Sequence, residues 1–126
     1  MRSIVRSPGL PAVLIFLAYL GVTVGLLPQE VSWANAGSDG GDYMAAVLSG
    51  GIPHPSGYPT YILLNRVFQA LPYATPYWRG AFFSACMAGL SCALLYLWLM
   101  RQYGGRQPKP RDYFATALGS LAWAQT

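Results

Sequence analysis

The stretch that decides the fold is Gly80 to Met100, GAFFSACMAGLSCALLYLWLM, which contains no charged residue. As an α-helix it extends about 32 Å, which matches a bilayer core of about 30 Å. An earlier uncharged stretch, Leu10 to Leu27, reads LPAVLIFLAYLGVTVGLL. It extends about 27 Å as a helix and is just long enough to span. The sequence therefore predicts two complete transmembrane helices, over residues 10–27 and 80–100.

A signal peptide is the alternative for the first stretch, because Arg2 and Arg6 precede it. Such peptides have an apolar region of about 7–15 residues, which is shorter than this run. The segment that follows, LLPQEVSWANAG, offers only a weak cleavage site. We therefore expect an uncleaved helix.

The composition agrees with a membrane protein. Hydrophobic residues make up 54% of the 126 residues and charged residues only 10%. A soluble domain carries about 25% charge, and a disordered chain is poor in apolar residues. The net charge of +4 comes without a dense basic cluster, so we expect membrane lipid and not nucleic acid as a partner. The two cysteines, Cys86 and Cys92, form no disulfide scaffold and lie on different faces of the second helix.

A third apolar run begins at Tyr113 and continues to Thr126. Its 14 residues are too few to span reliably. We expect a truncated third helix and a fragment of a longer multi-helix protein; an authentic short chain is the alternative. Within the second helix, small residues recur at every fourth position: Ala81, Ala85, Gly89 and Ala93. This spacing suits close helix packing in lipid; the ordinary composition of a membrane helix is the alternative explanation.

Basic residues orient these helices. Arg2 and Arg6 precede the first helix, and the linker 101–112 holds Arg101, Arg106, Lys109 and Arg111. By the positive-inside rule, both flanks are cytoplasmic. The prediction is an integral protein of the plasma or inner membrane, or of the endoplasmic reticulum in a eukaryote, with residues 28–79 as an external loop.

The external loop begins with two acids, Asp39 and Asp42, just before a short apolar stretch that ends at Gly50-Gly51. These acids have two interpretations. They cap a short helix, with Asp39 as the N-cap and Asp42 as the second half of a capping box. Alternatively, they form a carboxylate pair that acts as general base or binds a metal.

The next part of the loop is Gly51-Ile52-Pro53-His54-Pro55-Ser56-Gly57-Tyr58-Pro59. Three prolines impose an extended path and a turn. His54 could carry a proton, contact a phosphate or bind a metal; a surface turn is the alternative. The chain has one histidine, so a histidine-rich metal site is excluded and no metal site is predicted.

Residues 59–71 then predict an amphipathic helix in the plane of the membrane interface. Its apolar stripe consists of Leu64, Val67, Phe68 and Leu71, with Asn65, Arg66 and Gln69 on the opposite side. Arg79, at the return to the membrane, either binds a lipid phosphate or simply flanks the second helix.

Two motifs carry a resemblance to a known family. They are Asp39-Gly40-Gly41-Asp42-Tyr43-Met44-Ala45-Ala46 and the run Gly51 to Tyr61, joined by Trp78-Arg79. With these motifs, residues 10–126 resemble the N-terminal portion of the DUF2723 family, membrane glycosyltransferases of the GT-C type related to protein O-mannosyltransferases. The family pattern has Asp-x-Gly-Glu, so the second acid here is one methylene shorter.

The resemblance implies an all-α integral membrane fold whose N-terminal part is present here. It implies transfer of a sugar from a polyprenyl-phosphate carrier to an acceptor of unknown identity, with a divalent metal as an optional cofactor. Carried over by motif, Asp39 is the catalytic carboxylate and Asp42 its partner. The substrate-binding candidates are His54, Tyr58 and Arg79. A small non-enzymatic scaffold or subunit, whose external loop binds a partner, is the competing hypothesis.

Overall fold

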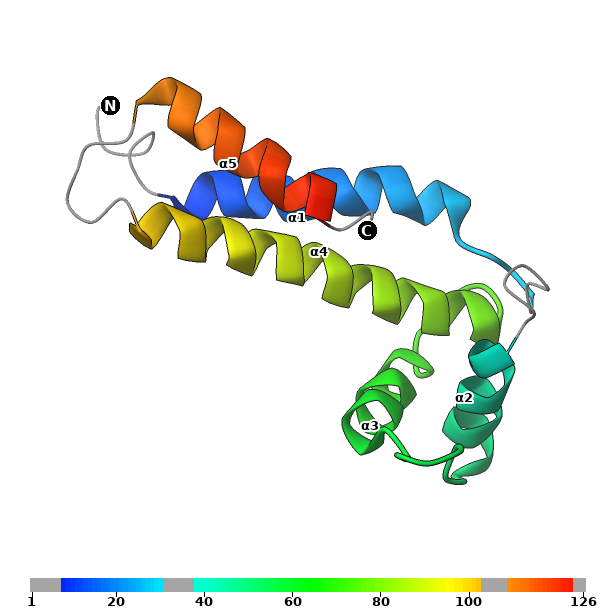
Figure 1. The fold of residues 1–126 in the computed structure, drawn as a ribbon. Coiled ribbons are helices and arrows are strands. Elements are labelled where there is room, and N and C mark those ends of the chain that lie inside the picture. Colours follow the sequence, from blue (N-terminus) through cyan, green and yellow to red (C-terminus); the bar gives the residue numbers. More distant parts are fainter. Residues whose placement is uncertain (1–7, 31–37, 103–108, 124–126) are drawn as a thin grey trace. The chain divides into compact units, whose positions relative to one another are not determined.

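The computed structural model describes residues 8–30, 38–102 and 109–123. The elements are α1 (Gly9–Thr23), the short 3₁₀ helix η2 (Val24–Leu26), α2 (Ser38–Ser49), α3 (Pro59–Phe68), α4 (Pro76–Gln102) and α5 (Pro110–Trp123) (Figure 1). No strand occurs among the described residues. The predicted all-helical class is therefore confirmed for this part of the chain.

Two helical stretches are long and apolar enough to cross a membrane, Gly9–Leu26 with 18 residues and Pro76–Gln102 with 27. They cover the predicted span 80–100 completely and the predicted span 10–27 except for its last residue, Leu27. Large apolar side chains on them are exposed, including Leu14 and Leu17 of α1 and Leu94 and Trp98 of α4. Water would oppose this exposure at about 25 cal/mol per Å², whereas lipid would not. The pattern indicates a membrane protein.

The contacts divide the chain into two compact units. We call the first the span unit; it contains α1, α5 and the part of α4 from Ala85 onward. We call the second the connector unit; it runs from Leu26 to Ser84 and contains α2, α3 and the start of α4. Each is described separately below.

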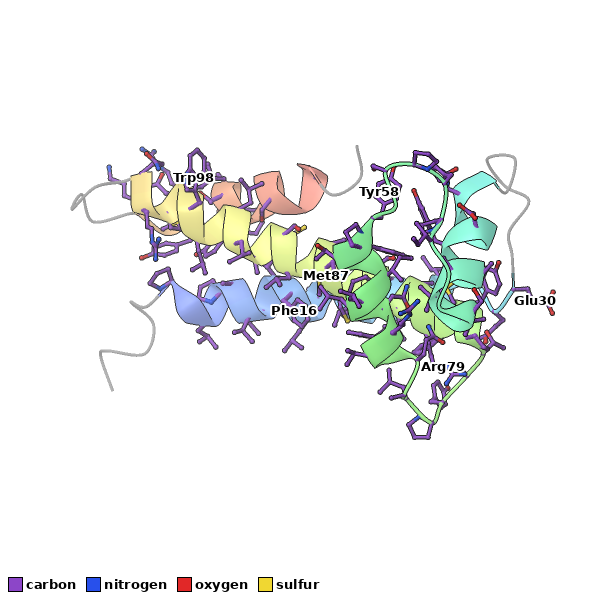
Figure 2. The ribbon with its side chains drawn as sticks, turned by 90° about the horizontal axis from the view of Figure 1, so that it is seen from below. Phe16, Glu30, Tyr58, Arg79, Met87 and Trp98 are labelled. Carbon is purple, nitrogen blue, oxygen red and sulfur yellow. The ribbon has the colours of Figure 1, made fainter. Side chains whose placement is uncertain are left out.

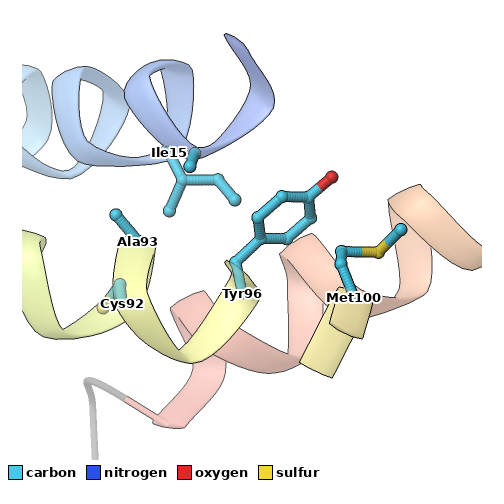
Figure 3. Packing of buried hydrophobic residues seen from close by; sticks show 6 residues of the cluster. Ile15, Cys92, Ala93, Tyr96 and Met100 are labelled. Atoms are coloured by element: carbon cyan, nitrogen blue, oxygen red, sulfur yellow. The ribbon is translucent and has the colours of Figure 1, made fainter. Parts of the chain in front are cut away.

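The core of the span unit forms where α1 meets α4. Cys92 and Tyr96 of α4 are fully buried in a cluster with Ile15. Figure 3 shows Ile15 reaching toward Ala93 and Tyr96. A Cβ placed on Gly89 would lie 3.1 Å from Phe16 and 3.2 Å from Tyr19. The small residues therefore let α4 approach α1, as their spacing predicts, and both cysteines are free.

Helix α5 begins at Pro110, three residues before the predicted start at Tyr113. Proline fits the first helical position because it has no N–H to leave unpaired. The Asp112 carboxylate accepts a hydrogen bond from the Lys109 backbone N–H at 2.7 Å, which closes the first turn. With 14 residues, α5 is too short to span on its own, and residues 124–126 lie outside the described part.

In the connector unit, α2 packs against α3 through Ala46, Val47 and Ile62, all buried. The Arg66 side chain ties the two helices together. Its Nε and Nη2 donate hydrogen bonds to the carbonyl oxygens of Val47 and Ala46, each at 3.2 Å. These carbonyls lie near the C-terminus of α2, where a cation also complements the helix dipole.

Helix α3 differs from its prediction in length and in the face it buries. It ends at Phe68, three residues before the expected Leu71. Asn65 is fully buried, whereas Leu64 and Val67 are 45% and 68% exposed. Arg66 of the polar side turns toward α2, where it finds hydrogen-bond partners, and the buried Asn65 Oδ1 accepts a hydrogen bond from Gln69 Nε2 at 3.0 Å. Of the predicted apolar stripe, Leu64 and Val67 face outward, whereas Phe68 packs against Phe82 and Phe83.

The contact at Gly89 gives a stability prediction. Gly89→Leu forces the rings of Phe16 and Tyr19 apart and should destabilise the protein by about 1–3 kcal/mol. Gly21→Leu on α1 is the matched control, because nothing lies within 4 Å of its Cβ position. Thermal unfolding in detergent measures both variants. Equal losses at the two sites would contradict the proposed packing of α1 on α4.

Candidate site at Asp42 and His54

The most specific polar contact in the connector unit joins Asp42 to His54. Asp42 Oδ2 accepts a hydrogen bond from the His54 backbone N–H at 2.8 Å. The same oxygen lies 2.7 Å from His54 Nδ1. Two motifs that are twelve residues apart in the sequence thus meet at one carboxylate oxygen.

Local chain chemistry explains how this contact forms. Helix α2 ends at Ser49, and Gly50 adopts a positive φ of 79° that turns the chain back. The prolines on either side of His54 keep the segment extended. A second turn follows, in which the Gly57 N–H donates to the His54 carbonyl oxygen at 2.9 Å and Gly57 also has a φ of 79°.

The capping-box interpretation of Asp42 is wrong, because its carboxylate bonds to His54 and not to the start of α2. Hydrogen bonds from the His54 backbone and side chain lower the pKa of Asp42 below its ordinary value of 3.8. The carboxylate is therefore ionised near neutral pH and only accepts hydrogen bonds. His54 Nδ1 must then carry the proton, so a neutral ring has its lone pair on Nε2. This arrangement of acid and histidine suits acceptance of a proton at Nε2, whereas contact with an anion there needs a ring protonated on both nitrogens.

Two tyrosine rings flank the histidine, whose side chain is 41% exposed. The Tyr43 ring stacks on His54 with centroids 5.5 Å apart and planes at 25°. The Tyr58 ring meets both in edge contacts, at 5.1 Å from Tyr43 and 5.8 Å from His54. A hydrogen bond with Tyr58, with smaller effects of burial and of nearby acids, raises the pKa of Tyr43 to about 12. Tyr43 therefore stays protonated and neutral near His54.

Asp39 occupies a different position from Asp42. It lies in the first turn of α2 with an exposed side chain, and α2 itself begins one residue earlier, at Ser38. It makes no hydrogen bond or ion pair with any described residue. Three residues separate it from Asp42, so both lie on one side of the helix. Asp39 is thus exposed, while His54 engages Asp42.

The structure brings Tyr58 to the predicted site and holds Arg79 elsewhere in the connector unit (Figure 2). Arg79 Nη1 donates to the carbonyl oxygens of Gln69 and Leu71, at 2.9 and 2.8 Å. These bonds close the turn that follows α3. Arg79 contacts none of the other candidate residues in the described structure.

Sequence reasoning missed Tyr43 as a member of the site, although it follows Asp42 directly in the quoted motif. The missing signal was spatial, since only the return of the chain at Gly50 brings His54 beside α2. No group of three or more potential metal ligands occurs among the described residues.

Two apolar helices, with a folded segment between them in the sequence that presents an acid–histidine pair, indicate a membrane protein that carries a polar site. Residues 39–124 match the family model described as the Protein O-mannosyl-transferase TMEM260 N-terminal domain, and the chain belongs to this family. The match begins at Asp39 and includes both motifs of the site. No curated protein and no solved structure matches the chain.

The lowered pKa of Asp42 makes a pH prediction. A carboxyl group whose pKa is lower in the folded state stabilises that state above its unfolded pKa of about 3.9. This contribution is lost as the pH falls through the folded value. Asp42→Asn should therefore lower the unfolding temperature near neutral pH, and the difference should shrink as the pH falls below about 4.

Asp39→Asn is the matched control, because Asp39 has no described polar contact. Thermal unfolding over a pH series should show no comparable pH-dependent difference for this variant. A loss for Asp42→Asn that is the same at every pH would contradict the role of the ionised carboxylate.

Proposed function

We propose that the chain is the N-terminal part of a membrane mannosyltransferase, in which the connector unit forms the acceptor side of the active site on the external face. The donor is a polyprenyl-phosphate-linked mannose and the acceptor a protein hydroxyl. A relation to the DUF2723 family and a GT-C-type fold belong to the same proposal. The family match supports the reaction class, and the Asp42–His54 contact is the observation that carries the site.

The reaction is a single displacement with inversion at the anomeric carbon. The acceptor hydroxyl oxygen forms a bond to this carbon while the bond from the carbon to the carrier phosphate oxygen breaks. The electron pair of the broken bond leaves with the lipid phosphate, and the hydroxyl proton goes to the base. Because a phosphate is a good leaving group, the protein mainly removes a proton and stabilises charge.

We assign the base to Asp39. Its carboxylate is exposed and engaged by no described residue, so an acceptor hydroxyl can approach it. Asp42 is less suited to this role, because its Oδ2 already accepts two contacts from His54. Removal of a general base lowers the reaction rate by about 10²–10⁴-fold.

Asp42 and His54 have a positioning role in this proposal. The carboxylate fixes the ring through Nδ1 and the backbone N–H, which leaves the lone pair of Nε2 to accept a hydrogen bond from the acceptor hydroxyl. Tyr43 and Tyr58 restrict the ring further by their contacts. A divalent metal is compatible with the exposed Asp39 but is not required by the scheme.

The experiment is a transfer assay of the full-length membrane protein with polyprenyl-phosphate mannose and acceptor protein. Asp39→Asn should reduce transfer by about 100-fold or more, and Asp42→Asn by about 10–100-fold. Glu30→Gln is the control, because Glu30 is exposed and outside the site. All three variants must accumulate in the membrane at wild-type levels.

Transfer retained in Asp39→Asn would sink the assignment of the base. A wild-type protein that binds a partner stably but shows no transfer with any polyprenyl-phosphate sugar would favour the scaffold hypothesis.

A further inference from the structure

A groove of about 430 Å³ lies in the connector unit between the end of α2 and the start of α3. Its apolar lining consists of Ile52, Pro59, Ile62 and Leu63, and the rest includes glycines of segment 50–57. This segment also carries His54. The volume is within the range of about 300–1,000 Å³ that is typical of ligand sites.

Arg66 is the one charged residue among the described residues that line the groove. Its Nε and Nη2 are held by carbonyl oxygens of α2 at 3.2 Å, while Nη1 donates to no described residue. The guanidinium is therefore held in place before any ligand arrives, and little side-chain entropy remains to be lost. A fixed guanidinium beside an apolar wall suits a phosphate attached to an apolar chain.

The surroundings of the groove also favour a lipid. Ile52 is 87% exposed and Leu63 61% exposed, and they rim the groove with apolar surface. Further along α3, Leu64 and Val67 point outward while Asn65 is buried. This polarity is the reverse of that of a helix on a water-soluble protein and is typical of one at a membrane interface. The two candidate spans that flank the connector unit in the chain keep it near the bilayer.

We propose that this groove binds the phosphate end of a polyprenyl-phosphate lipid. Arg66 contacts the phosphate, and Ile52 and Leu63 contact the first isoprene units. The proposal rests on the proposed function, since that function supplies the identity of the lipid, and it adds where the carrier docks. The groove is lined by part of segment 50–57, which also carries His54, so a bound carrier would lie next to this segment.

The test is an equilibrium titration of the full chain, in nanodiscs of zwitterionic lipid, with a polyprenyl monophosphate that bears no sugar. Leu63→Glu and Ile52→Glu each place a carboxylate in the lining of the groove. Each should weaken binding at least about tenfold, since a carboxylate replaces apolar surface against the first isoprene units and adds a like charge near the phosphate. Val67→Glu is the matched control, because Val67 is 68% exposed on the same helix and does not line the groove. It should change the Kd by less than about twofold.

Equal weakening by Val67→Glu, or unchanged binding in both groove variants, would overturn the proposal. So would unphosphorylated polyprenol binding as tightly, or phosphatidylglycerol competing as well as the polyprenyl phosphate. Inorganic phosphate alone should not compete at similar concentrations, because it lacks the apolar chain. The titration involves no sugar transfer. A negative titration would therefore not affect the transfer assay of Asp39→Asn, and a negative transfer assay would not affect the titration.

Discussion

One carboxylate oxygen organises the polar part of this protein. Asp42 Oδ2 accepts both the backbone N–H and the ring Nδ1–H of His54, which joins α2 to the proline-rich segment that follows it. Without this contact, an extended segment with no regular hydrogen bonds of its own would have many conformations. The contact also determines which nitrogen of His54 faces outward, and it distinguishes the two acids of the motif. Asp42 positions the His54 ring, whereas the Asp39 side chain stays exposed and makes no hydrogen bond or ion pair with a described residue.

A second constraint comes from the membrane. Both long helices expose large apolar side chains, and α3 exposes Leu64 and Val67 while it buries Asn65. Buried polar groups then need partners inside the connector unit. Gln69 Nε2 donates to Asn65 Oδ1 at 3.0 Å, and Arg66 and Arg79 donate to main-chain carbonyls. Arg79, which the sequence predicts as a ligand contact, thus stabilises a turn, and Arg66 stabilises the end of α2. Arg66 does so while it also faces the groove.

Much of the fold was predictable from the sequence, because uncharged runs and helix-ending glycines are strong local signals. Both apolar helices and the end of α2 at Gly50 follow directly from these signals. The burial of Asn65 was not predictable, since periodicity shows that a helix is amphipathic but not which side meets protein and which meets lipid. For the site, the motifs identified Asp42, His54 and Tyr58, but the pairing depends on a chain reversal that spacing does not encode. Arg79 was predicted as a site residue because it precedes the second apolar helix in the sequence. In the structure its guanidinium instead bonds the carbonyl oxygens of Gln69 and Leu71 in the turn after α3, which the sequence pattern does not reveal.

The central claim is that the ionised Asp42 fixes the tautomer of His54. The chain has a single histidine, so selective ¹⁵N labelling of histidine gives one pair of ring signals with no assignment problem. Nitrogen NMR of the membrane-reconstituted protein near pH 8 should show a neutral ring protonated at Nδ1, and Asp42→Asn should change this tautomer balance. A ring protonated mainly at Nε2, or the same spectrum in the wild type and in Asp42→Asn, would contradict the account.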